Sequence, residues 1–579
     1  MLQLSPFVPY ALMKRTTRYI IPALVLFIVG AALGFQFDRS ASDGSMDELR
    51  KLEEAFMQIN RNYVEEVDAR NLSESAIRKM LEELDPHSAF IPAEEVERLQ
   101  DSYRGSFGGV GIWFEIVDDT ARVISPIDGG PSQDAGVRAG DRIIQIEDSS
   151  AVGLTNQGVQ ERLRGEIDTR VRMTVERLGV EDPMTFTITR GEIPLYSVTG
   201  AHMIDEQTGY VQILRFAQTT YDEFKEAVAE LEAQGMERLV IDMRSNPGGV
   251  MESAIRMADE FLGRGMPIVS TKGRTMRDQS FRASGNGSMR DGSVIVMVDP
   301  RSASASEIVA GALQDHDRAL VVGQRTFGKG LVQRQFPLPD GSMMQMTTAR
   351  YYTPSGRLIQ SPYDGGGQDA YMEAKFETLE QATLDPDGYR ASIPDSLRHQ
   401  TAQGRTVFGG GGIMPDHVLP PDTAAAPVAQ AIYQRAFSPL ARQWFSQNEQ
   451  EIREEWGERR DAFLETFAAS DDLIEQMLAP AFAEDARSDF GLRLVTDEAD
   501  ARPDNSVFHA ADVQERQDML ATFVKGYLAQ QLYGSDVATP IYRQLDPELK
   551  EALKLWDEAD KLAMHHRSNG TTGFGDARR

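Results

Sequence analysis

The chain of 579 residues contains no cysteine. Disulfide bonds, thiolate nucleophiles and cysteine-ligated zinc or iron–sulfur centres are therefore excluded. Basic residues are also in short supply, with 60 Lys and Arg against 89 Asp and Glu and a net charge of −29. Because affinity for phosphate backbones needs concentrated Lys and Arg, this balance argues against a general nucleic-acid binder. An acidic surface of this kind indicates solubility rather than a particular partner.

One uncharged and largely apolar run, residues 19–35, follows Lys14, Arg15 and Arg18. At about 1.5 Å per residue it just reaches across a thin hydrocarbon core. Basic residues before the run predict that residues 1–18 stay in the cytoplasm and that the chain after Asp38 is exported. We expect a single-pass anchor in a bacterial inner membrane, with the bulk of the chain in the periplasm. A cleaved signal peptide and a buried core helix are the alternatives.

Residues 46–100 predict a small helical element. Apolar residues recur there at helical spacing, and a second helix is predicted from Leu72 to Leu84 before the pattern breaks at Asp85–Pro86. The spaced residues of the first helix are Leu49, Leu52, Phe56, Ile59 and Tyr63. No chemistry follows from this element.

Residues 105–195 change to short strands and glycine turns. GGVGIWFEI and TARVISPI predict strands, AGVRAGDRIIQIED a tight turn and a strand, TNQGVQERLRG a helix, and RVRMTVERL with MTFTITRG a hairpin. In this order they resemble a PDZ domain. The resemblance implies that backbone N–H groups of Gly109, Val110, Gly111 and Ile112 receive a peptide carboxylate, while the next strand edge pairs with the peptide. A purely structural glycine turn is the alternative.

Residues 196–420 predict an α/β domain. Apolar strands at Arg238–Arg244, Ser293–Asp299 and Ala319–Gly323 alternate with helices expected at Val250–Leu262 and Glu307–Gln314. This alternation favours a buried, partly parallel sheet with right-handed crossovers. The turns SNPGG and PRSASAS follow the first two strands, at the sheet edge where functional residues of such sheets gather. Residues 421–579 predict a mostly helical, charged C-terminal extension.

Three serines at one of these strand-to-helix junctions are candidate nucleophiles. Ser302, Ser304 and Ser306 precede the expected helix, whose first turn offers free N–H donors. Serines at such a position also serve as helix caps, which is the competing interpretation for all three.

A serine nucleophile needs a base. His316 is a poor candidate, because it follows Ser304 by twelve residues and should lie about 15 Å away along the same helix. Lys329 is flanked by two glycines and follows a buried strand. Burial disfavours a charged amine, so a neutral lysine can exist near pH 7. A surface lysine in a turn is the alternative.

Five motifs in chain order, NPGG, SASASEIVAGALQD, GKGLVQ, ARYYTPSGRLIQ and GGIMPD, resemble those of the carboxyl-terminal processing (tail-specific) peptidases. The resemblance covers about residues 46–420. It implies that Ser304 is the nucleophile, that Lys329, 25 residues later, is the general base, and that Gln333 orients the lysine.

The same resemblance implies an oxyanion hole made of backbone N–H groups. These belong to Gly249, or Gly248, and to Ala305, the residue after the proposed nucleophile. The implied reaction uses no metal and no other cofactor.

The resemblance also implies the architecture and the activity. It predicts an α/β peptidase core of the crotonase and ClpP-like kind, an inserted PDZ module of β-sandwich or barrel form, a helical N-terminal element and a mostly helical C-terminal extension. The expected activity is that of an extracytoplasmic serine endopeptidase whose PDZ module binds protein substrates with free, apolar C-termini.

Two alternatives compete with this function: a non-catalytic PDZ scaffold of the cell envelope and a crotonase-like acyl-CoA enzyme. The acyl-CoA chemistry gives no role to a Ser–Lys pair. The physiological substrate, a homo-oligomeric state and an activating adaptor stay open.

Overall fold

The computed structural model describes residues 46–127, 129–177, 179–363, 365, 367–419, 437–482, 493–495, 507–509 and 517–568. The expected membrane span at residues 19–35 and the cytoplasmic N-terminus lie outside these residues. No helix in the described ranges is long and apolar enough to cross a membrane. The chain divides into two compact units, Met1–Met80 and Leu81–Arg579.

The described part of the first unit is helical, as predicted. A helix covers residues 46–62, and α2 (Ala69–Glu82) begins three residues before the predicted Leu72 and ends two before Leu84. Of the apolar residues that predicted the first helix, Phe56 is partly buried and the other four, Leu49, Leu52, Ile59 and Tyr63, are exposed.

A separate β-rich module begins after α3 (Ala93–Arg104) and β2 (Ser106–Gly109). Its sheet has the order β3-β4-β5-β7-β8, with β6 paired to β5. The bounds are β3 (Ile112–Val117), β4 (Thr120–Pro126), β5 (Arg142–Ile146), β6 (Ser149–Ser150), β7 (Arg170–Glu176) and β8 (Met184–Thr189). A short helix, α4 (Pro131–Asp134), and the helix α5 (Asn156–Leu163) complete it, and β9 (Gly191–Pro194) returns antiparallel to β2. Because β3 ends the sheet, one of its edges is unpaired within the sheet.

The expected α/β domain is built on a second six-stranded sheet of order β10-β11-β12-β15-β16-β21. The strands are β10 (Val198–Met203), β11 (Thr208–Ile213), β12 (Arg238–Asp242), β15 (Ser293–Val298), β16 (Leu320–Gly323) and β21 (His417–Val418). All pairs from β11 to β21 are parallel, and only β10 is antiparallel. The prediction of a buried, partly parallel sheet is therefore confirmed.

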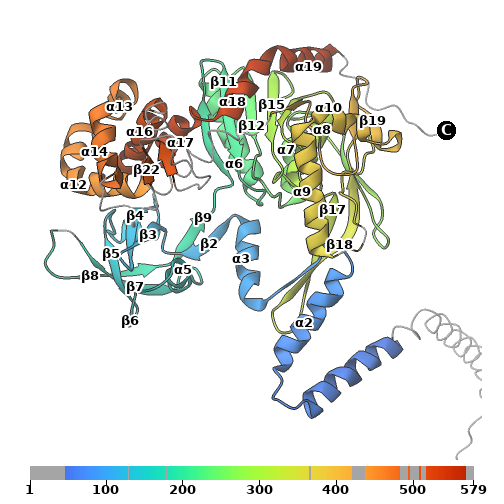
Figure 1. Cartoon of the computed structure of the whole chain (residues 1–579), viewed down its shortest axis with the longest axis horizontal. Helices are drawn as coiled ribbons and strands as arrows, with labels where there is room; N and C mark the ends of the chain where they lie inside the picture. Colours follow the sequence, from blue (N-terminus) through green and yellow to red (C-terminus); the bar gives the residue numbers. More distant parts are fainter. Residues whose placement is uncertain are drawn as a thin grey trace, which may run out of the picture. The chain divides into compact units, whose positions relative to one another are not determined.

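Successive strand residues point to opposite faces of this sheet and enter two different cores. One face, with Leu239, Ile241 and Val296, packs under α6 (Thr220–Ala233), α7 (Met251–Asp259) and α8 (Ala305–Asp315). The other face, with Val240 and Ile295, is covered by α18 (Pro547–Ala552) and α19 (Trp556–Ser568) (Figure 1). Both faces are buried, which explains the uninterrupted apolar strands.

A smaller sheet, order β1-β18-β13-β14 with β17 on β18, carries the rest of the site. Its strands are β1 (Ala89–Ile91), β13 (Pro267–Lys272), β14 (Gln279–Arg282), β17 (Leu331–Pro337) and β18 (Met343–Tyr352). Between the ARYYTPSGRLIQ and GGIMPD motifs lie two further helices, α9 (Gln368–Leu384) and α10 (Pro386–Ser392), and a hairpin of β19 (Arg398–Gln400) and β20 (Thr406–Phe408).

The C-terminal extension has its own helical core before it reaches the sheet. Helices α12 (Ser438–Trp456), α13 (Arg460–Thr466), α14 (Asp471–Phe482), α16 (Gln517–Tyr533) and α17 (Ser535–Arg543) bury an aromatic-rich cluster that includes Phe437, Phe463 and Tyr527. The predicted extension thus has two parts: a helical cluster that touches the edge of the peptidase-like sheet through α17, and the helices α18 and α19 that cover one face of it.

Candidate active site

Two turns meet at the carboxyl ends of the neighbouring parallel strands β12 and β15. The turn of residues 243–250 joins β12 to α7, and residues 299–304 join β15 to α8. The two are bonded to each other, since Ala303 N–H donates to Asn246 O at 2.9 Å. The predicted gathering of both motifs at one sheet edge is therefore observed.

The three candidate serines have different surroundings. Ser302 donates its hydroxyl to Met243 O at 2.8 Å, and Ser306 donates to Asn246 O at 3.1 Å. Both are fully buried. Ser304 is half-buried and lines a cleft next to Gly249. Of the three, Ser304 is therefore the one available to a substrate.

Ser304 has a strained backbone. It occupies the N-cap position of α8 with φ 53° and ψ −109°, a region that residues other than glycine rarely adopt. Such strain costs on the order of 1–3 kcal/mol and persists only where neighbours hold it. Here Glu307 holds it, because its Oε2 accepts the Ser304 N–H at 2.8 Å.

The Glu307 carboxylate joins the serine turn to the lysine turn. Its Oε2 accepts N–H groups of both Ser304 (2.8 Å) and Lys329 (2.9 Å). Its Oε1 accepts the Gly328 N–H at 2.7 Å and the Thr326 hydroxyl at 2.6 Å. Burial raises the pKa of Glu307, and these four donors oppose that rise. Since every neighbour donates, the arrangement fits the ionised carboxylate.

A second side chain makes the same connection from the other side. The buried hydroxyl of Tyr351, in β18, lies 2.9 Å from Ser304 O and 2.7 Å from Lys329 O. The backbones of Ser304 and Lys329 are therefore tied to each other at both N–H and C=O by two fully buried residues, Glu307 and Tyr351.

Lys329 lies in a desolvated position. Burial lowers its pKa, while Asp85 and Glu307 act in the opposite direction. A lowered pKa increases the fraction of neutral amine at pH 7, as a lysine base requires. His316, by contrast, is the C-cap of α8 and lies at the opposite end of the helix from Ser304, with Nε2 2.6 Å from Pro267 O.

The glycines of the 243–250 turn differ in what their N–H groups do. Gly248 donates its N–H to Asn246 Oδ1 at 2.9 Å, so this donor is already used. Gly249 lines the cleft, with φ 138°. An added Cβ on Gly248 would lie 2.8 Å from the Ser304 Cβ and 2.9 Å from the Ala305 nitrogen, so only glycine allows this approach.

Gln333 follows Lys329 on β17, with its side chain bonded elsewhere. Its amide donates to His87 O, and its Oε1 accepts from Gln345 Nε2 at 2.9 Å. Within the described residues no hydrogen bond joins Gln333 to Lys329. The Gln333 amide keeps a second N–H and a second lone pair on Oε1 beyond these two bonds.

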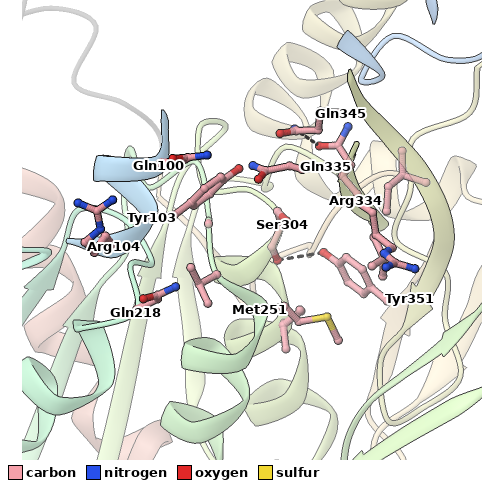
Figure 2. Close-up of a pocket in the computed structure, with 16 residues that line it drawn as sticks. Gln100, Tyr103, Arg104, Gln218, Met251, Ser304, Arg334, Gln335, Gln345 and Tyr351 are labelled. Carbon is pink, nitrogen blue, oxygen red and sulfur yellow. Dashed lines mark hydrogen bonds between the residues drawn. The ribbon is translucent and has the colours of Figure 1, made fainter. Parts of the chain in front are cut away.

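The cleft in front of Ser304 has a volume of about 570 Å³. Figure 2 shows Ser304 between Tyr103 of α3 and Tyr351 of β18, with Gln335 and Gln345 above it. Its other walls are Met251 and residues of the β17 strand. The side chains are mostly polar amides and aliphatic groups, which suit an extended peptide backbone better than a small apolar ligand.

The loop expected to bind a carboxylate links β2 to β3. Gly111 has φ 73°, and the carbonyls of Val110 and Gly111 accept from Ser132 N–H and Ile127 N–H, each at 3.0 Å. An anion at this loop would be bound by N–H groups, because only they attract a negative charge. The loop passes directly into the edge strand β3, where a peptide can add as a strand.

The comparisons with known proteins identify the family of this chain. A family model described as peptidase family S41 matches residues 207–366, a PDZ domain model matches residues 122–177, and a model of the activating protease CtpB N-terminal domain matches residues 31–95. A carboxy-terminal-processing protease of Bartonella bacilliformis is 38% identical over 318 residues, which cover 54% of this chain and 73% of the relative. The carboxy-terminal processing protease CtpA of Bacillus subtilis is 33% identical over 346 residues, which cover 59% of this chain and 73% of CtpA.

Among solved structures, the photosystem II D1 C-terminal processing protease is 30% identical, with a TM-score of 0.30, and matches 54% of this chain and 94% of that chain. Fold and matches together define a serine peptidase with a PDZ domain. The chain belongs to peptidase family S41, among the carboxy-terminal-processing proteases. The expected family and fold class are confirmed.

Sequence reasoning missed four contributors to the site. Glu307 follows Ser304 by three residues, which is the spacing of a helix capping box and could have been recognised. Tyr351 lies within the ARYYTPSGRLIQ motif, but its contacts with Ser304 and Lys329 carry no local signal. The same holds for the turn at His87 and the buried amine of Lys375, because distant segments bring them to the site.

Lys375 of α9, like Lys329, affects the electrostatics of the site. Its Nζ lies 3.2 Å from the centroid of the Phe327 ring and 3.1 Å from the Tyr371 hydroxyl. Burial lowers the pKa of Lys375 to about 7. Burial together with the charges of Lys329 and Lys375 lowers the pKa of His87 to about 4, so His87 is neutral at pH 7.

Proposed function

We propose that this serine peptidase is an endopeptidase that cleaves protein substrates selected by their C-termini, with Ser304 as nucleophile and Lys329 as general base. The observation that carries the proposal is the double connection between these two residues. Glu307 binds both of their N–H groups and Tyr351 contacts both of their carbonyls. Two side chains that fix one pair of backbones are best explained if the pair acts as a unit.

The reaction follows from this pair. Neutral Lys329 takes the proton of the Ser304 hydroxyl, and the alkoxide attacks the carbonyl carbon of the scissile peptide bond. Protonated Lys329 then gives its proton to the leaving amine as the C–N bond breaks. Water, deprotonated by the again neutral Lys329, hydrolyses the acyl-enzyme and restores Ser304.

The tetrahedral oxyanion needs donors on the side away from the lysine. We assign them to the backbone N–H groups of Gly249 and Ala305, because the Gly248 N–H already binds Asn246. Ala305 is the first residue of α8, so its N–H is one of the free donors of that helix terminus. Losing one such donor typically costs about 3–4 kcal/mol in the barrier.

Substrate selection is assigned to the PDZ module. Backbone N–H groups between Gly109 and Ile112 bind the terminal carboxylate, and the edge strand β3 pairs with the residues before it. The preference is for free, apolar C-termini, since an amidated end carries no charge for these donors.

We further propose that residues 19–35 anchor the enzyme in the inner membrane, with the peptidase part outside the cytoplasm. The support is the uncharged run after Lys14, Arg15 and Arg18. Fractionation of cells that make the full chain tests the anchor. Recovery of a shortened chain in the soluble periplasmic fraction would show a cleaved signal instead.

The dyad is tested by single substitutions in the full chain. Ser304→Ala and Lys329→Ala should each abolish cleavage of a peptide with a free apolar C-terminus while the melting temperature stays unchanged. The double variant should lose no more than either single variant, since the groups act as a unit. Near-normal turnover by the Lys329→Ala enzyme would contradict the assignment of the base.

The scaffold alternative makes a different prediction for the same variants. A non-catalytic PDZ protein would show no turnover in the unmodified chain, yet would bind peptides through Gly109–Ile112. Measuring peptide binding and cleavage on the same preparation therefore separates the two functions.

A further inference from the structure

Arg244, in the 243–250 turn, is surrounded by three carboxylates. Asp242 of β12 accepts from its Nε at 3.0 Å and from Nη2 at 2.7 Å. Asp546 accepts from Nη1 at 3.1 Å and also from Nη2. Glu548 accepts from Nη1 at 2.7 Å. These bonds use all five N–H groups of the guanidinium, which fixes the Arg244 side chain completely.

Two of these carboxylates come from a segment about 300 residues further along the chain, beyond the part that the family model matches. Asp546 is the N-cap of α18, where its Oδ1 accepts the Leu549 N–H at 3.0 Å. Glu548, in the first turn of the same helix, also accepts from Gln324 Nε2 at 3.1 Å. The start of α18 is thus tied to the sheet edge that carries the 243–250 turn.

The bonds of this cluster favour the charged forms of Arg244 and Asp546. Burial alone would lower the pKa of Arg244, but its bonds to Asp242 and Asp546 raise it. Burial alone would raise the pKa of Asp546, but the bonds and the charge of Arg244 lower it. Because these side chains are at least five-sixths buried, removing one partner leaves the others without compensation.

The backbone of Ser245, the residue after Arg244, is strained, and this strain connects the cluster to the rest of the turn. Ser245 has φ 61°, which is unfavourable for a residue other than glycine. Its N–H is held by Asp299 Oδ1 at 2.9 Å, and Arg244 fixes the chain immediately before it. If Arg244 is released, Ser245 can relax to a negative φ. That rotation would shift the turn that follows, in which Gly249 lines the cleft.

We propose that Asp546 and Glu548 are positioning residues for peptide-bond cleavage, which hold the Gly249 N–H in place by fixing Arg244 from the C-terminal extension. This inference rests on the proposed function, since it gives the Gly249 N–H its role as an oxyanion donor. It assigns part of the catalytic geometry to a segment that otherwise only covers the sheet.

Asp546→Asn is the sharpest single change. The amide keeps an oxygen for the Leu549 N–H and so preserves the cap of α18, but it turns an NH₂ group toward the Arg244 guanidinium, where donor meets donor. Glu548→Gln is milder, because its amide can keep one oxygen on Arg244 while the Gln324 amide rotates to match. The double variant should show the largest effect.

The measurements are kcat and KM on a peptide with a free apolar C-terminus, and hydrogen exchange of the segment 243–257, all in the full chain. We expect Asp546→Asn to lower kcat by about 10- to 100-fold, part of the 10²–10³-fold loss on removing an oxyanion donor. KM should change less than twofold, because the cleft and the PDZ loop are untouched. Glu548→Gln should lower kcat less, and both variants should speed exchange in residues 243–257.

Asp560→Asn is the matched control. Asp560 lies in α19 and accepts a hydrogen bond from Ser293, at the start of β15 and so at the opposite end of the strand from the serine turn. It tests docking of the same C-terminal segment without touching Arg244, and should leave kcat and exchange unchanged.

An equal loss of kcat in Asp560→Asn and Asp546→Asn would overturn the proposal, because general loosening of the segment would then explain both. Unchanged kcat and unchanged exchange in Asp546→Asn would also overturn it. If the unmodified chain shows no peptidase activity, but Asp546→Asn still exchanges faster than the unmodified chain in residues 243–257, the structural contact stands and the proposed function is rejected.

Discussion

Glu307→Gln should separate the geometry of the Ser–Lys pair from the stability of the fold. The amide has one acceptor oxygen where the carboxylate has two. An NH₂ group in place of Oε2 would face the N–H groups of Ser304 and Lys329, neither of which can turn away. An NH₂ group in place of Oε1 would face the Gly328 N–H and the Thr326 hydroxyl. Of these two groups, the hydroxyl can rotate and accept a hydrogen bond from the amide. The amide should therefore take the second orientation.

The loss of folding stability in Glu307→Gln follows from the hydrogen bonds that the amide in this orientation loses or weakens. One buried donor, the Gly328 N–H, loses its acceptor, which costs about 1–3 kcal/mol. The bonds to Ser304 and Lys329 remain but weaken from charge-assisted to neutral, roughly halving their strength. Loss of the buried charge offsets part of this, since burial raises the pKa of Glu307. We expect a fall of about 1–3 kcal/mol in the free energy of unfolding.

Activity should suffer more than stability. A displacement of reacting groups by about 1 Å can cost 10²-fold in rate. We therefore expect a kcat about 10²-fold lower with little change in KM, measured with a quenched fluorescent peptide. The labelling rate of Ser304 by a fluorophosphonate should fall in parallel.

Thr326→Val is the matched control. It removes one bond to Glu307 and the acceptor of the Ile413 N–H, which Thr326 binds at 2.7 Å, yet leaves both bonds of Oε2 in place. The Thr326→Val protein should lose about as much folding stability as the Glu307→Gln protein, yet keep most of its kcat. Equal losses of kcat in the two variants, or normal kcat in Glu307→Gln, would refute the reasoning.

Three further predictions concern other groups. Because Lys329 must be neutral to accept a proton, kcat/KM should rise with pH up to its lowered pKa, below about 10.4; activity that peaks in acid and falls toward pH 8 would contradict a lysine base. The pKa of Lys375, about 7, lies below its unfolded value, so the unfolded chain binds more protons above pH 7 and stability should rise with pH by about 1.4 kcal/mol per unit up to about pH 10. Lys375→Met should reduce the slope of stability against pH in urea unfolding at pH 7.5–9.5 to what Lys329 contributes, and an unchanged slope would assign it elsewhere. Amidating a peptide's C-terminus should weaken binding to the Gly109–Ile112 loop by about 1.5–3 kcal/mol per lost bond in calorimetry, whereas equal affinity for acid and amide would leave these glycines a structural turn.

Local pattern was enough to predict the central sheet. Strands β12, β15 and β16 fall within the apolar runs that predicted them, and α8 begins two residues before the predicted Glu307. The family motifs also brought Ser304 and Lys329 forward as a pair. The strands and the helix were predicted correctly because each signal lies within a short stretch of sequence, whereas the pairing of Ser304 with Lys329 stays a prediction.

Contacts between distant segments could not be predicted in this way. The His87 turn lies 246 residues before Gln333, and Arg244 precedes Asp546 by 302. The helices α18 and α19 look like any charged, amphipathic helices, so nothing in their composition shows that they cover the sheet. The placement of Lys375 depends on helix α9, whose pattern does not reveal which loop it packs against.

The covering of the sheet by α18 and α19 has a consequence for the order in which the protein is made. Synthesis proceeds from the N-terminus, so residues such as Val240, Ile295 and Val322 are formed long before the helix residues that bury them. Until residues 547–563 have been added, one apolar face of the catalytic sheet stays open to water. The sheet that carries the serine turn therefore acquires the cover of its second apolar face only when α18 and α19 have been made.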